Sequence, residues 1–125
     1  MKGLTFLSGV PKLQREAAMR RSEVNSSQLP VCEVMASPQC GYVATDFHHR
    51  KLRSQGGGHN IGNCLMCCRA CHRAIHADVG LSYERGWLVK SHANPLETPC
   101  LRRGEYVVLD DEGGYTPEMK EVSNE

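Results

Sequence analysis

Residues 46–76 read DFHHRKLRSQGGGHNIGNCLMCCRACHRAIH, and their pattern predicts the central elements of the fold. β-branched and aromatic side chains alternate weakly over residues 42–48 and predict a strand that ends at two histidines. The three glycines at 56–58 allow a loop with positive φ angles or close approach to another chain. Residues 63–66 predict a second strand and residues 69–77 a helix, so a strand, a glycine loop, a strand and a helix follow one another.

Before this stretch the sequence predicts one short helix. Pro11 stands at a tolerable first-turn position, and residues 12–21 are rich in helix formers. We expect this helix to be amphipathic, with one face formed by Leu13, Ala17 and Arg20. Residues 25–30 are expected to be a polar linker.

Beyond the stretch the sequence predicts short strands over residues 87–90 and 106–109, with an acidic turn at residues 110–114. The polar C-terminal residues after this turn are expected to fray. The predicted fold is therefore a small α+β domain. We expect an N-terminal helix and linker (1–29), a core (30–90), and a C-terminal strand extension with an acidic tail (91–125).

The composition limits the chain to a modest hydrophobic core. A length of 125 residues suits one domain. The seven cysteines are an odd number without a secretory leader, which favours thiolate metal ligation in a reducing compartment over a disulfide framework. No apolar run approaches the ~20 residues of a membrane span. We therefore expect a soluble, cytoplasmic protein.

The charge is unevenly placed although the net charge is only +1. Residues 1–104 hold 14 Lys+Arg against 7 Asp+Glu, whereas residues 105–125 hold 1 against 7. Residues 48–76 contain no acidic side chain, and their basic ones are Arg50, Lys51, Arg53, Arg69 and Arg73. Such a segment can meet phosphates without repulsion, but a solvated basic face explains the pattern equally well.

Four of the cysteines can form one tetrahedral metal site. Cys68 and Cys71 make a C-x2-C knuckle, and Cys32 and Cys40 make a wider pair. Four thiolates suit Zn²⁺, and the site would add folding free energy that a small core lacks. Two alternatives stay open, one that pairs Cys67 with Cys71 and one that leaves Cys32 out.

Two histidine pairs carry the stronger chemical signal. His72 and His76 lie one turn apart on the predicted helix, so two imidazoles can bind one ion. His48 and His49 are successive strand residues that point to opposite sides, so one can join the metal while the other faces a different part of the site. Phosphodiester hydrolysis needs these two functions, a base for the water and a cation for the developing charge.

The ordered combination of HH, GG, N, CxxCH and a final H resembles the zinc-stapled HNH endonucleases, especially small stand-alone ones of bacteriophage type. The resemblance covers roughly residues 30–90. It implies a ββα-metal (HNH or His-Me finger) core with a structural four-cysteine zinc site.

Carried over position by position, the resemblance implies individual roles. His49 stands at the general base, and Asn63 at the Asn that braces the loop and orients the base. The implied ligands of the catalytic metal are His48, His72 and His76. Cys64 and Cys67 stand where relatives have apolar residues, which implies that they pack in the core.

The implied activity is hydrolysis of DNA with one divalent ion, either Mg²⁺, Mn²⁺, Ni²⁺ or Zn²⁺. His49 would take a proton from the attacking water while the ion stabilises the phosphate and the departing 3′-oxygen, and a 5′-phosphate would remain. The five basic side chains would hold the DNA backbone, which predicts weak sequence specificity, with nicking or double-strand cleavage. Phage packaging or terminase proteins are partners by analogy only.

Two non-catalytic interpretations compete with a nuclease. A zinc-binding nucleic-acid module explains the cysteines and the basic face, but it does not need the histidines and Asn63 together. A second structural zinc site made by the histidines would give a scaffold without turnover.

Four other residues carry weaker signals. His59 and His92 lie outside the pattern and are expected to be solvent-exposed, although His59 could touch DNA. Trp87 is expected to pack a strand against the core. Asp46 is either a partner of a ligand histidine or a surface carboxylate.

Overall fold

The computed structural model describes residues 9–23 and 29–118. The helices are α1 (Lys12–Ser22), α2 (Arg69–Ala77) and α3 (Val79–Glu84), with short 3-10 helices at Arg53–Gln55 and Ile61–Asn63. The strands are β1 (Asp46–His49), β2 (Cys64–Cys67), β3 (Cys100–Arg102), β4 (Glu105–Leu109) and β5 (Tyr115–Pro117). β1 pairs with β2, and β3, β4 and β5 form an antiparallel sheet in that order. The expected small α+β fold is confirmed.

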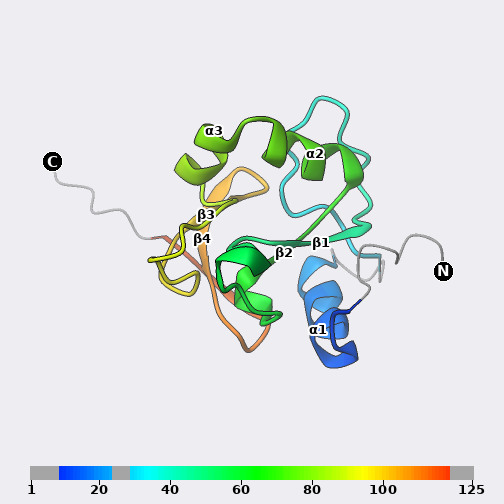
Figure 1. Cartoon of the computed structure of the whole chain (residues 1–125). Coiled ribbons are helices and arrows are strands. Elements are labelled where there is room, and N and C mark those ends of the chain that lie inside the picture. The colour runs from blue at the N-terminus through cyan, green and yellow to red at the C-terminus, as the bar shows by residue number, and fades with distance from the viewer. Residues whose placement is uncertain (1–8, 24–28, 119–125) are drawn as a thin grey trace, which may run out of the picture.

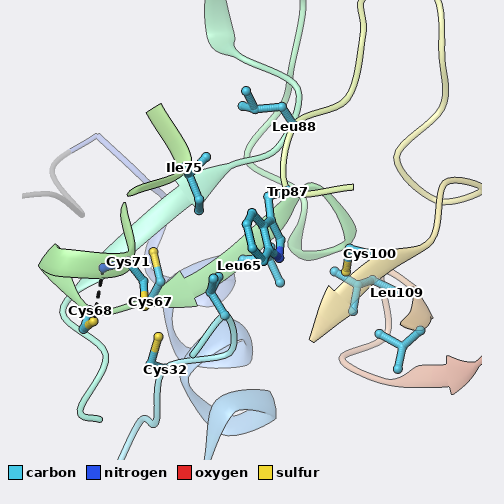
Figure 2. Close-up of a cluster of buried hydrophobic side chains, with 12 residues drawn as sticks. Cys32, Leu65, Cys67, Cys68, Cys71, Ile75, Trp87, Leu88, Cys100 and Leu109 are labelled. Carbon is cyan, nitrogen blue, oxygen red and sulfur yellow. Dashed lines mark hydrogen bonds between the residues drawn. The ribbon is translucent and has the colours of Figure 1, made fainter. Parts of the chain in front are cut away.

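The β1–β2 hairpin is buried on both faces because helices cover it from two sides. α1 lies on one side and α2 on the other (Figure 1). Cys64 and Met66 of β2 pack in a cluster with Ala18 of α1. The alternate residues, Leu65 and Cys67, pack in a second cluster with Ile75 of α2 and Trp87 (Figure 2). Since successive strand residues point to opposite faces, one apolar strand joins both cores.

α2 has the bounds that the sequence predicts. The thiol of Cys68 accepts the backbone N–H of Cys71 at 3.4 Å and caps the helix. Cys71 and Ile75, four residues apart, form its buried face. Asp78 ends the helix and accepts the N–H of Leu81 at 3.1 Å, which begins α3. The sequence reasoning missed α3, although an Asp directly before an apolar residue, here Asp78 before Val79, is a helix-start signal.

The predicted strand over residues 42–48 begins later, at Asp46. Tyr42 has a positive φ of 71°, which breaks the extended conformation. Val43 makes only an isolated bridge with Val31. The strand therefore consists of the four residues that pair with β2.

The helix predicted over residues 12–21 is present as α1, but the face formed by Leu13 and Ala17 is not the face that it buries. Leu13 is 76 % exposed, whereas Ala18, Arg21 and Ser22 are buried. The burial of Arg21 was not readable from a hydrophobic pattern, because its hydrogen-bond partners Glu33, Ile61 and Cys64 are distant in the sequence. Most of the predicted 25–30 linker lies outside the described residues.

The predicted strand at residues 87–90, which lies wholly in the described part of the chain, is wrong. The N–H groups of Trp87 and Leu88 both donate to the carbonyl of Ser82. Trp87 is buried as expected, and its indole N–H donates to Leu101 at 2.7 Å. The predicted strand at 106–109 is confirmed as β4, but the residues after the acidic turn form β5 where fraying was expected.

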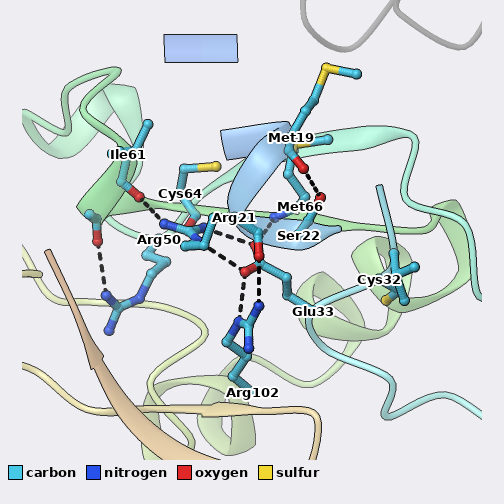
Figure 3. Close-up of polar contacts among 12 residues, drawn as sticks. Met19, Arg21, Ser22, Cys32, Glu33, Arg50, Ile61, Cys64, Met66 and Arg102 are labelled. Atoms are coloured by element: carbon cyan, nitrogen blue, oxygen red, sulfur yellow. Dashed lines mark hydrogen bonds and ion pairs between the residues drawn. The ribbon is translucent and has the colours of Figure 1, made fainter. Parts of the chain in front are cut away.

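Glu33 is the centre of a buried ion network (Figure 3). Arg21 donates to both oxygens of Glu33, at 2.8 and 2.9 Å, and Arg102 donates to Oε2 at 2.7 Å. The N–H of Met66 donates to Oε1 at 2.9 Å. Burial acts to raise the pKa of Glu33, but the two guanidiniums outweigh it and lower this pKa to about 2. The network therefore ties α1 and β3 to the hairpin through one carboxylate.

No helix within residues 9–23 and 29–118 is long and apolar enough to cross a membrane.

Candidate active site

Three imidazoles converge where β1 meets α2. His48 comes from β1, and His72 and His76 come from successive turns of α2. One ligand nitrogen of each lies within 4.8 Å of those of the other two. His48 is buried, His72 is half-buried and His76 is exposed. The cluster is therefore buried at one end and open to solvent at the other, as a site that receives a substrate requires.

Hydrogen bonds set which nitrogen of His48 can bind a metal. His48 Nε2 lies 2.6 Å from the carbonyl oxygen of Trp87. A carbonyl only accepts, so Nε2 carries the proton and Nδ1 carries the lone pair. Burial lowers the pKa of His48 to about 3, and the neighbouring imidazoles act in the same direction. His48 is therefore a neutral imidazole with one available lone pair.

Asp46 orients the second imidazole. His72 Nδ1 lies 2.8 Å from Oδ2 of Asp46, so in neutral His72 the lone pair is on Nε2. Asp46 also accepts from Arg69 at 3.2 Å and from the hydroxyl of Thr45 at 2.8 Å. Its side chain is fully buried, which excludes the surface-carboxylate interpretation. A carboxylate behind a histidine is the arrangement that fixes ligand histidines in metal sites.

His49 ends β1 beside the cluster. Its ring packs against Phe47 with centroids 5.2 Å apart, and its Nε2 lies 3.0 Å from Nδ1 of His59. Burial lowers the pKa of His49 to about 4, helped by the charges of His59, Arg53 and His72. His49 is therefore neutral near pH 7 and can accept a proton.

Asn63 braces the loop between the two strands. It is buried, and its Oδ1 accepts the N–H of Lys51 at 2.7 Å. Its Nδ2 donates to the carbonyls of Lys51 and Gly58, each at 3.0 Å. Gly57 is required here, because a Cβ would clash with the carbonyl oxygen of Lys51. One amide therefore closes the loop that starts after His49.

The four predicted zinc ligands come together in a second cluster. The thiols of Cys32, Cys40, Cys68 and Cys71 lie within 4.8 Å of one another. All seven cysteines are described and none forms a disulfide. Cys67 packs in the hydrophobic core (Figure 2) and lies outside the four-thiol cluster, whereas Cys32 belongs to it, so the arrangement favours the four-cysteine set over the two alternatives.

Backbone N–H groups point at these sulfurs. Met35 donates to Cys32 at 3.3 Å, and Gly41 donates to Cys68 at 3.3 Å. Burial acts to raise the pKa of Cys68, but the N–H groups of Cys71 and Gly41 lower it to about 7. Four thiols with N–H donors around them fit a Zn²⁺ ion, which binds thiolates.

The predicted DNA-contacting role of Arg50 is wrong. Arg50 is fully buried. Its guanidinium donates to four backbone carbonyls, those of Gly62, Gly86, Pro95 and Thr98. A guanidinium held in this way joins the glycine loop to the segment before β3 and cannot reach a phosphate. Sequence position alone could not separate it from its neighbours.

The other four basic residues are at least partly accessible. Arg53, Arg69 and Arg73 are exposed, and Lys51 is half-buried. Arg53 donates to the carbonyl of Gly57 in the glycine loop at 2.8 Å, whereas Lys51 donates to the carbonyl of Ser91, outside that loop, at 3.1 Å. Arg69 and Arg73 lie on α2, the helix that carries two of the clustered histidines.

His59 is the site residue that the sequence reasoning set aside. It was expected to be a solvent-exposed loop histidine, yet its ring faces His49 at 3.0 Å. Its position between the glycines and Asn63 was the available signal. His92 is exposed as expected.

Comparison with known proteins agrees with this arrangement. Residues 32–78 match the HNH endonuclease family. The matched segment contains the four clustered cysteines, the three clustered imidazoles, His49 and Asn63. No curated protein and no solved structure matches the chain. Members of this family are typically nucleases that act on nucleic acid with divalent metals. Residues 32–78 are therefore similar to an HNH endonuclease domain.

Proposed function

We propose that this protein is a metal-dependent endonuclease that hydrolyses phosphodiester bonds in DNA. The observation that carries the proposal is the convergence of His48, His72 and His76 within 4.8 Å beside the neutral imidazole of His49. Three clustered imidazoles, two of them oriented by hydrogen bonds, suit a divalent ion, and a separate neutral imidazole suits a general base. A structural site would not need the fourth histidine.

The ion would be held by one ring nitrogen each of His48, His72 and His76. In His48 and His72 the other ring nitrogen is hydrogen-bonded, to the carbonyl of Trp87 and to Asp46 respectively. The bound ion, whether Mg²⁺, Mn²⁺, Ni²⁺ or Zn²⁺, would supply positive charge for the phosphate and the leaving 3′-oxygen. A second ion, Zn²⁺, would hold the four cysteines together and stabilise the fold.

The chain itself supplies the base and the positioning. His49 accepts a proton from water, whose oxygen then bonds to phosphorus while the bond to the 3′-oxygen breaks. Asn63 keeps the loop after His49 in place through Lys51 and Gly58. Four basic side chains hold the DNA backbone, and these are Lys51, Arg53, Arg69 and Arg73. Because backbone contacts carry little sequence information, we expect cleavage with low specificity, as nicks or double-strand breaks.

The setting of this activity rests on the resemblance to small phage proteins and on the free thiols. Seven cysteines without a disulfide suit a reducing compartment, so we propose that the protein acts in a bacterial cytoplasm during phage genome processing. Packaging or terminase proteins are the partners that this role would involve.

A plasmid assay tests the proposal. Supercoiled DNA is incubated with the wild type and with His49→Ala, in turn with Mg²⁺, Mn²⁺, Ni²⁺ and Zn²⁺, and metal content is measured beside it. We expect cleavage by the wild type and a loss of about 10²- to 10⁴-fold in His49→Ala, because a general base contributes that much. His92→Ala is the matched control, since His92 is exposed and belongs to neither metal cluster.

Three outcomes would contradict the proposal. Undiminished cleavage by His49→Ala would remove the general base. Bound metal and bound DNA without cleavage under any ion would favour a zinc-dependent binding module. Discrete fragments from varied DNA would refute low specificity.

A further inference from the structure

The ring of His59 faces the proposed base directly. His59 Nδ1 lies 3.0 Å from His49 Nε2, and the two ring centroids are 5.1 Å apart. The separation is that of a hydrogen bond between two imidazoles. Neither the family match nor the metal cluster assigns a function to His59.

Two hydrogen bonds hold the backbone just before His59. Asn63 donates to the carbonyl of Gly58 at 3.0 Å, and Arg53 donates to the carbonyl of Gly57 at 2.8 Å. These two carbonyls belong to the residues just before His59. The loop therefore presents the imidazole of His59 to His49 from a fixed position, and the brace made by Asn63 reaches His49 through it.

Two neutral imidazoles can share this hydrogen bond in two ways. If His59 donates, Nε2 of His49 is occupied and its Nδ1 carries the proton, so His49 has no lone pair for water. If His49 donates its Nε2–H, its Nδ1 carries the lone pair and can accept a proton. Only the second arrangement suits a general base.

We propose that His59 is a positioning residue for His49: it accepts the Nε2–H of His49, holds the ring in place and keeps the basic lone pair on Nδ1. The inference rests on the proposed nuclease activity and deepens it. The nearest analogue in physical terms is the carboxylate that orients the histidine of a serine protease, with an imidazole nitrogen as the acceptor. When His49 has taken a proton at Nδ1, its Nε2–H still points at the acceptor.

Steady-state cleavage of a short duplex separates positioning from binding. His59→Ala removes the acceptor, whereas His59→Asn places an amide oxygen near the position of Nδ1. We expect kcat of His59→Ala to fall about 10- to 100-fold, the usual loss when the partner of a functional histidine is removed, with KM changed less than about twofold. His59→Asn is expected to recover most of kcat. His92→Ala again serves as the control.

The tautomer of His49 gives a readout that needs no turnover. In ¹⁵N NMR of the full chain with zinc, we expect His49 to be protonated at Nε2 in the wild type and in His59→Asn, and to be a mixture of tautomers in His59→Ala. A wild-type His49 protonated at Nδ1, or an unchanged tautomer and kcat in His59→Ala, would overturn the inference. If the wild type cleaves no DNA but shows the expected tautomers, the proposed function is refuted and the hydrogen bond from His49 to His59 stands.

Discussion

Replacing Glu33 by glutamine removes the one negative charge of a buried network while keeping nearly the same shape. Arg21 and Arg102 donate to Glu33 at 2.7 to 2.9 Å, and Glu33 is fully buried. Its pKa lies at about 2, against an ordinary value of 4.5. A shift of that size corresponds to about 3 kcal/mol of stability at pH 7. We therefore expect Glu33→Gln to lower the free energy of unfolding by about 3 kcal/mol.

The sign of the pH dependence follows from the lowered pKa. The charge of Glu33 contributes fully above the unfolded pKa near 4.5 and loses its contribution as the pH falls through the folded pKa of about 2. The stability difference between wild type and Glu33→Gln should therefore shrink between these two values. Both proteins are compared at equal zinc content at each pH, because loss of metal from the cysteines at low pH also lowers stability.

Urea unfolding followed by circular dichroism at several pH values measures this difference. Glu16→Gln is the matched control, since Glu16 makes only an exposed i,i+4 pair with Lys12. Such a pair is worth about 0.3 to 0.5 kcal/mol. A Glu33→Gln effect below about 1 kcal/mol at pH 7, or one that does not change with pH, would refute the reasoning.

Three further predictions concern the metal sites and the basic residues. Cys68→Ser should lower the bound zinc by one equivalent and destabilise the fold. Cys100 lies outside the cysteine cluster, so Cys100→Ala should keep its zinc. Equal zinc contents of the two variants by elemental analysis would contradict the four-cysteine site. Asp46→Asn should weaken binding of the catalytic ion about 10- to 100-fold by calorimetry, because the amide cannot match the carboxylate that accepts from His72; unchanged affinity would count against this orienting contact. Arg50→Lys should lower the melting temperature without a specific effect on DNA affinity, since Arg50 donates to four carbonyls. Arg73→Ala, at an exposed position, should weaken DNA binding in a salt-dependent manner and leave stability unchanged. The opposite pattern in fluorescence anisotropy and thermal melts would contradict these assignments.

Local sequence determined the elements that carry the site. The bounds of α2 follow from residues within one helix, and the i,i+4 spacing of His72 and His76 places both on one face wherever that helix lies. The opposite directions of His48 and His49 follow from strand geometry alone. The grouping of four cysteines was also chosen from spacing, because a C-x2-C knuckle leaves few partners for a tetrahedral ion.

The roles of several residues depend on partners that are distant in the sequence and could not be predicted from it. Arg50 and Arg53 are alike in sequence, yet one is buried among carbonyls from residues 62 to 98 and the other is exposed. Asp46 becomes an orienting carboxylate because α2 folds back over β1, and His59 reaches His49 because Asn63 closes the loop. A side chain's type and spacing limit what it can do, but burial and hydrogen-bond partners depend on segments that only folding brings together.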